Sequence, residues 1–167
     1  MPTKITALTA LAAVPELTDI LAIIDDPAGS PISKQITVDN LLKRKIEYIA
    51  VALGDESTVL AAASTTVPVT TFHMPYAFTL TDVKVGCTVA GTGAALVTID
   101  VHEAGTTVLS TKVTVDATEK TSGTAATPPV VSDSTLAVDS LIEVFVDLVD
   151  TDNVAAGVKV YLIGYQT

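Results

Sequence analysis

The stretch VTIDVHEAG at residues 97–105 alternates apolar and polar side chains before it reaches a glycine-containing turn. In an extended chain, its valines and isoleucine fall on one face, and its threonine, aspartate and histidine fall on the other. A period of two is typical of a β-strand with one buried face. The stretch therefore predicts a half-buried strand that ends in a hairpin.

The same alternation recurs across the last two-thirds of the chain, where β-branched Thr and Val are also concentrated. We count roughly eight strands at the 8–12-residue spacing of sandwiches and barrels, starting with 46–53, 58–63 and 66–72. This pattern predicts a mainly β protein, an antiparallel jelly-roll-like β-sandwich over residues 46–167, although spacing does not reveal strand order. The apolar positions that define the alternation are Val83, Val85, Cys87 and Val89; Leu109, Val113 and Val115; Ile142, Val144, Val146 and Leu148; and Val158, Val160 and Leu162.

Residues 1–45 have a different character. A short apolar run predicts a strand, the turn-forming DPAGSP follows at 26–31, and residues 33–38 return as a second strand. Residues 37–45 then predict a short helix with basic residues at its C-terminal end. Because so short a segment buries little by itself, we expect an α/β segment that packs on something else. Its anchoring side chains would be Leu21, Ile23, Ile24, Leu41 and Leu42.

Composition narrows the classes of function. Hydrophobic residues make up 49% of the chain, which is enough for a core, and the net charge is -10 with only nine Lys and Arg. A nucleic-acid partner needs clustered basic residues, so we expect none. No apolar run is long enough to span a bilayer, so we expect no membrane insertion. With Cys87 as the single cysteine, no intrachain disulfide forms, which fits assembly in a reducing cytoplasm.

A few residues could carry chemistry. Asp100 and His102 stand two apart on a strand and project the same way, as in a metal site, but no third or fourth ligand is signalled. A polar outer face near a hairpin is the simpler interpretation. We expect His73 to pack at a bend, and Cys87 to be a buried and inert thiol because no activating base lies nearby.

Asp147, Asp150 and Asp152 form an acidic cluster whose oxygens could hold Ca²⁺, although the spacing is not that of an EF-hand. A solvated acidic turn is the simpler interpretation, and we expect it. No nucleophile elbow, phosphate-binding glycine loop or metalloprotease motif occurs in the sequence. We therefore expect a protein that is not an enzyme and uses no cofactor.

Four apolar side chains fall on the polar faces of the expected strands: Phe145 beside Glu143 and Asp147, and Tyr161, Ile163 and Tyr165 beside Lys159. Aromatic residues outside a core mark contact surfaces. We interpret these four as part of a subunit interface. The alternative is that loops or the N-terminal segment cover them, or that both faces of the sheet are buried.

Two parts of the chain resemble virion structural proteins of tailed bacteriophages. The opening resembles the N-terminal attachment module of tail-fibre and appendage proteins, in KITAL at 4–8, ELTDIL at 16–21 and SKQITVDNLL at 33–42. The remainder resembles a β-sandwich domain of tail fibres and head decorations, in TFHMPYAFTLTDV at 71–83, VTIDVHEAG at 97–105, LSTKVTVD at 109–116, EKTS at 119–122 and VKVYLIG at 158–164.

This resemblance implies a homo-oligomer, usually a trimer, without catalytic residues, that is assembled in the host cytoplasm into the virion and contacts capsid or tail proteins. The chain lacks a long shaft and a large receptor-binding tip, which favours a capsid decoration or head-fibre protein over a tail-fibre or baseplate component. A carbohydrate-binding adhesion module that recognises a host-surface glycan is the alternative, because β-sandwiches often bind sugars. Only seven aromatic residues and no Trp are available for that role.

Overall fold

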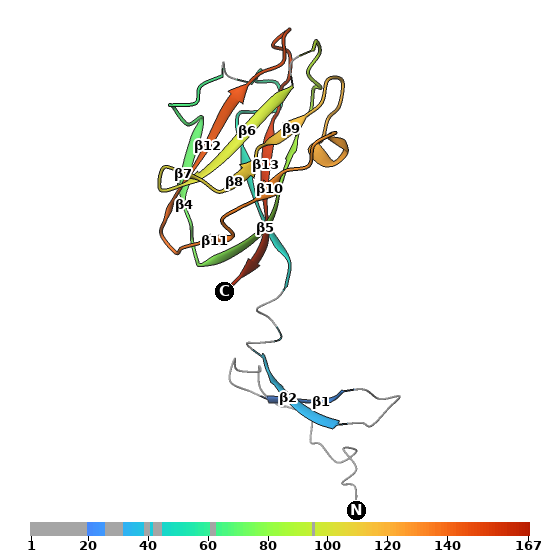
Figure 1. Ribbon diagram of the computed structural model, residues 1–167, viewed down its shortest axis with the longest axis vertical. Helices are drawn as coiled ribbons and strands as arrows, with labels where there is room; N and C mark the ends of the chain where they lie inside the picture. Colours follow the sequence, from blue (N-terminus) through green and yellow to red (C-terminus); the bar gives the residue numbers. More distant parts are fainter. Residues whose placement is uncertain (1–19, 26–31, 39–40, 42–44, 61–62, 95) are drawn as a thin grey trace, which may run out of the picture. The chain divides into compact units, whose positions relative to one another are not determined.

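The computed structural model describes residues 20–25, 32–38, 41, 45–60, 63–94 and 96–167 (Figure 1). The chain divides into two compact units, Met1–Lys45 and Ile46–Thr167. The division lies where the sequence changes from the predicted attachment segment to the repeated strands.

In the first unit, two strands pair antiparallel: β1 (Ile20–Asp25) and β2 (Ile32–Thr37). The register places Ile20 opposite Thr37 and Asp25 opposite Ile32. Val38 and Leu41 are helical, and the rest of the expected helix lies outside the described residues. The hairpin is thus most of what the structure describes in the predicted attachment segment.

The second unit contains a four-stranded antiparallel sheet, which we call sheet I, in the order β11-β5-β13-β3. Its strands are β3 (Glu47–Ala52), β5 (Phe78–Gly86), β11 (Thr135–Leu136) and β13 (Lys159–Gln166). The register of β13 against β5 shifts between Ile163 and Gly164. At Gly164 the backbone oxygen of Thr79 approaches so closely that a Cβ atom there would lie 2.0 Å away. Glycine is therefore required where the two long strands pass the irregularity.

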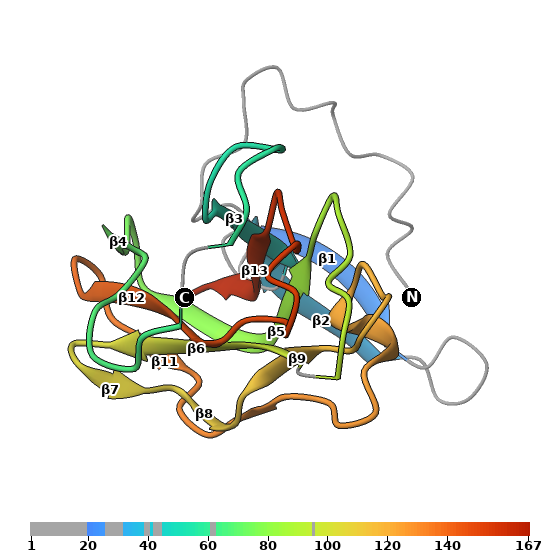
Figure 2. The same ribbon diagram turned by 90° about the horizontal axis from the view of Figure 1, so that it is seen from above.

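Sheet II has the order β4-β12-β6-β7, and β9 also pairs with β6. Its strands are β4 (Thr70–His73), β6 (Val97–Glu103), β7 (Thr106–Thr107), β9 (Val113–Val115) and β12 (Leu141–Leu148). Two short strands also pair with each other, β8 (Leu109–Thr111) and β10 (Val130–Val131). The last described element of this unit is a 3₁₀ turn at Ser122–Thr124. Figure 2 shows β3 and β13 on one side of β12 and β6, as two layers.

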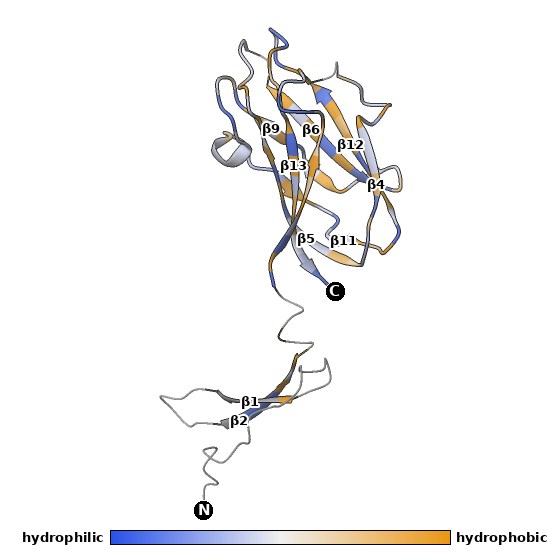
Figure 3. Cartoon of the chain, turned by 180° about the vertical axis from the view of Figure 1, so that it is seen from behind, coloured by the Kyte–Doolittle hydropathy of each residue, from blue (hydrophilic) through white to orange (hydrophobic). Residues whose placement is uncertain are grey.

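The core lies between the two sheets and follows the period of two. In Figure 3, apolar stretches alternate with polar ones along the long strands. Burying one face of each strand removes the apolar side chains from water, which is the dominant stabilising term. The fully buried positions include Phe78, Leu80, Val83, Val85, Ile99, Val101, Ile142, Val144, Val146, Val160 and Leu162.

The structure confirms a mainly β protein whose antiparallel sheets pack as a sandwich, whereas the jelly-roll connection pattern stays a prediction. Three expected strands differ. Residues 58–63 and 66–72 contribute isolated bridges and the four-residue β4, and 109–115 divides into β8 and β9, which pair with different neighbours. Val89 and Leu148 are each 44% exposed and not in the core. Val89 lies beyond the end of β5, and Leu148 follows a register shift in β12.

Candidate functional site

An apolar strip covers part of the outer face of sheet I. Tyr161 and Ile163 lie on β13, and Tyr48 lies on the neighbouring β3, where Ile163 and Tyr48 are paired in register. Tyr48 is 69% exposed and Ile46, just before β3, is 74% exposed. The rings of Tyr48 and Tyr161 meet edge to face with centroids 6.2 Å apart. We call Ile46, Tyr48, Tyr161 and Ile163 the apolar strip.

The strip lines a shallow groove of ≈ 500 Å³ that also reaches Glu47 and Lys84. Lys84 pairs with Asp82 on the same strand, with 3.7 Å between Nζ and Oδ2. The groove is therefore largely apolar with a charged rim, which is the usual composition of a contact surface.

The structure brings together two of the four predicted interface residues, Tyr161 and Ile163. Tyr165, further along the same face of β13, is partly exposed but does not line the groove. Sequence reasoning missed Ile46 and Tyr48. The available signal was that the stretch 46–53 carries apolar residues on both faces, which one buried face does not explain.

Phe145, another of the predicted interface residues, is buried and not available on the surface, because its exposed fraction is 5%. It lies on the outer face of sheet II against the ring of His102, with centroids 4.4 Å apart. Lys112 forms ion pairs with Asp100, which is opposite Phe145 in the register, and with Asp147, two residues along the same face. Side chains of the same chain therefore cover Phe145, as in the alternative stated for the interface.

Asp100 and His102 do point the same way, with 3.2 Å between Oδ2 and Nε2. Asp100 is only 2% exposed and also accepts hydrogen bonds from Thr107 Oγ1 at 2.6 Å and from the Val101 backbone N–H at 2.8 Å. Burial raises the pKa of the Asp100 carboxyl, but the bonds from Thr107, Lys112 and His102 outweigh it and lower the pKa. The bonds from Thr107 and Lys112 tie β6 to the chain that follows it.

The acidic cluster does not converge on one point. Asp150 is 2% exposed and accepts three backbone N–H groups, from Thr92 at 3.2 Å, Val154 at 3.1 Å and Ala155 at 3.2 Å. Burial raises its pKa, and the backbone hydrogen bonds outweigh that effect and lower it. Asp147 pairs with Lys112, and Asp152 accepts from Thr92 Oγ1 at 2.7 Å. The expectation of a solvated acidic turn is therefore wrong for Asp150, which organises two loops.

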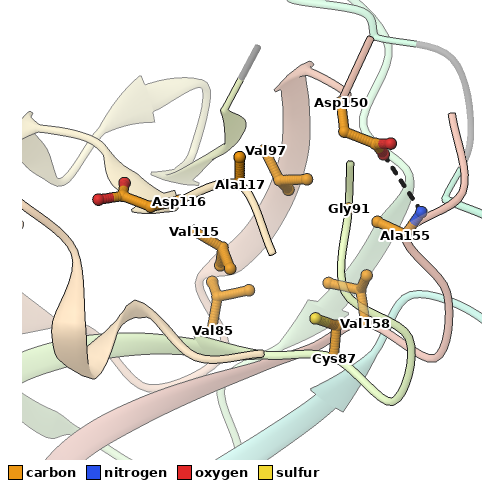
Figure 4. A pocket seen from close by; sticks show the side chains of 10 residues that line it. All are labelled: Val85, Cys87, Gly91, Val97, Val115, Asp116, Ala117, Asp150, Ala155 and Val158. Carbon is orange, nitrogen blue, oxygen red and sulfur yellow. Dashed lines mark hydrogen bonds between the residues drawn. The ribbon is translucent and has the colours of Figure 1, made fainter. Parts of the chain in front are cut away.

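Cys87 faces a small cavity of ≈ 10 Å³, lined by Val85, Val158 and other apolar side chains (Figure 4). A cavity of that size holds at most about one water molecule. Burial raises the pKa of the Cys87 thiol, which disfavours the reactive thiolate. The thiol is partly buried, and its Sγ lies 3.7 Å from the backbone oxygen of Glu119.

The other predicted residues lie outside this surface. His73 ends β4 and its Nδ1 lies 2.8 Å from the backbone oxygen of Asp139, but its side chain is exposed instead of packed. Of the anchoring residues, Leu21, Ile23 and Ile24 lie in β1, Leu41 is helical and exposed, and Leu42 is outside the described residues.

Comparison with known proteins finds no matching family model, no matching curated protein and no matching solved structure. Within the described ranges, no group of three or more His, Cys, Asp or Glu side chains is placed to hold a metal ion. None of the helical segments in the described part of the chain has the length and apolarity needed to cross a membrane.

Proposed function

We propose that this chain is a non-enzymatic structural protein of a tailed-bacteriophage virion, which associates with copies of itself through sheet I and with the particle through residues 1–45. The apolar strip is the observation that carries this proposal. Contiguous apolar surface that is exposed on a soluble domain marks a contact site, and Tyr is enriched at the centre of such contacts. The phage assignment and the three copies usual for such proteins come from the resemblance described above.

Within the particle, we assign the chain to capsid decoration or a head fibre, with a tail-fibre or baseplate position as the alternative. The sandwich would project outward while Leu21, Ile23, Ile24, Leu41 and Leu42 anchor the chain on capsid or tail proteins. Repeated copies on a symmetric particle add avidity to a contact that is weak for one chain. The net charge of -10 keeps so apolar a protein soluble before it assembles.

Particle fractionation tests the virion assignment. Antibody against the chain should label purified particles from the source culture, and should follow heads after heads and tails are separated. Deletion of residues 1–45 should abolish incorporation while the sandwich keeps its β-type circular-dichroism spectrum. If the chain is missing from purified particles, the proposal is wrong. If the antibody labels only tails, the protein is a tail component and not a head component.

A glycan-binding module is the second candidate, and the groove beside Tyr48 and Tyr161 favours it because sugars stack on exposed aromatic rings. The two rings stand edge to face and not in one plane, which offers a poorer platform than parallel rings. Glycan-array binding that is lost in Tyr161→Ala would support this candidate. If the chain binds no glycan on the array and does associate with itself, the structural role is supported instead.

A further inference from the structure

The strand β3 leaves one edge of sheet I open. Among the described residues, β13 is the only strand that pairs with β3. The other ends of sheets I and II are short, with two residues in β11, four in β4 and two in β7, whereas β3 has six. Proteins usually keep edge strands short, charged or interrupted by proline, because an open edge pairs with other chains.

The strand β3 carries none of these protections along most of its length. Its sequence is EYIAVA, with one charge at its first residue and no proline. Ile49 and Val51 pack against the core but stay partly exposed, because nothing described lies beyond them at the sheet edge. A further strand at this edge would cover both side chains and extend the apolar strip.

One hydrogen bond shows which backbone groups of β3 face the open edge. The N–H of Leu53 donates to the carbonyl of Val158 on the β13 side at 2.9 Å. Successive residues of a strand direct their N–H and C=O groups to opposite sides, so those of Val51, Ile49 and Glu47 also face β13. The N–H and C=O groups of Tyr48, Ala50 and Ala52 therefore face away from β13, toward the open edge.

We propose that two copies of this chain pair antiparallel through β3, with Ala50 opposite Ala50 on a two-fold axis. This inference rests on the self-association in the proposed function and names its contact. In this register, each copy's Tyr48 is opposite Ala52 and its Ile49 is opposite Val51. Large side chains thus meet small ones on the outer face, and apolar ones meet on the inner face. All the N–H and C=O groups of β3 that face away from β13 then form hydrogen bonds with the second copy.

A second copy suits this edge because the strand is complementary to itself. An isologous contact repeats every pairing twice, so like charges must not oppose each other. Glu47, the one charged residue of β3, falls opposite the apolar Leu53 of the other copy and not opposite a like charge. The two sheets then form one continuous sheet in which the apolar strips lie on the same face. This contact forms a dimer, whereas the resemblance implies a trimer.

Proline at position 50 tests the pairing in the full chain. Because the Ala50 N–H faces away from β13, Ala50→Pro leaves the pairing within the monomer intact and removes both central bonds between copies. The unaltered chain should show twice its mass of 17.2 kDa in sedimentation equilibrium. Ala50→Pro should raise the dimer dissociation constant roughly ten- to hundredfold, with its melting temperature as a monomer unchanged. Val51→Pro, one residue away, should unfold the domain because that N–H faces β13.

Ala50→Lys provides a second variant, since a lysine on an edge strand opposes pairing without altering the backbone. Val138→Lys is its matched control, because Val138 is exposed in a turn away from β3 and the charge change is the same. If the two Ala50 variants dissociate with the same constant as the unaltered chain, or if the chain forms a trimer, the β3 contact is overturned and the self-association is left intact. A full chain that stays monomeric at high concentration overturns both.

Discussion

Replacing Asp150 with alanine removes the acceptor for the backbone N–H groups of Thr92, Val154 and Ala155. A hydrogen bond to a charged group contributes roughly 1.5–3 kcal/mol, and a buried donor left without a partner costs a similar amount. The three bonds are long, at 3.1–3.2 Å, and water can enter the vacated space, so the loss of each bond should cost less than this range, about 1 kcal/mol. We expect Asp150→Ala to lower the free energy of unfolding by about 3 kcal/mol.

The assay is urea unfolding at pH 7, followed by far-ultraviolet circular dichroism. For a domain of this size, about 3 kcal/mol corresponds to a fall in melting temperature of roughly 12 °C. The matched control is Asp152→Ala, because Asp152 is exposed and accepts one hydroxyl bond from Thr92, so its loss should stay within about 0.5 kcal/mol. Equal losses in the two variants would refute the structural role of Asp150. Stabilisation of the unaltered chain by millimolar Ca²⁺, lost in Asp150→Ala, would show a cation site instead.

Further predictions concern close packing, the buried ion pair and pH. Gly164→Ala should destabilise by more than about 2 kcal/mol in the same unfolding assay, because the new Cβ meets the backbone oxygen of Thr79. Lys112→Met removes the cation beside buried Asp100, and a loss of about 1–2 kcal/mol should appear at pH 7 and shrink at low pH, when the carboxyl is neutral. Since the folded-state pKa values of Asp100 and Asp150 are lowered, stability should be complete above pH ~5 and should fall as the pH drops below ~4. Nuclear magnetic resonance titration should place the pKa of exposed Asp55 at about 2, because the hydroxyl and N–H groups of Thr58 and Ser57 bond its carboxylate.

The period of two was sufficient to predict the sandwich core, because local spacing decides which face of a strand is buried. Val83, Val85, Ile99 and Val144 all lie where the alternation placed them. The prediction failed where the strand stops or shifts register, at Val89 and Leu148, since neither event has a local signal in the apolar spacing.

The buried carboxylates could not be predicted from local pattern. Asp150 accepts a bond from Thr92, which lies 58 residues away in the sequence, and only the folded chain brings the two loops together. Phe145 was misjudged for the same reason, because the residues that cover its face include Lys112 from a separate segment. Tyr161 and Ile163 were found because their polar-face position is visible in one strand, whereas Tyr48 required the neighbouring strand to be known.

Residue-resolved amide hydrogen exchange of the full chain tests most directly whether sheet I continues into a second molecule. At concentrations where the chain is associated, we expect the amides of Tyr48, Ala50 and Ala52 to be as protected as those of Ile49 and Val51, and to lose that protection on dilution. Free exchange at the first three positions in the associated protein would contradict the account.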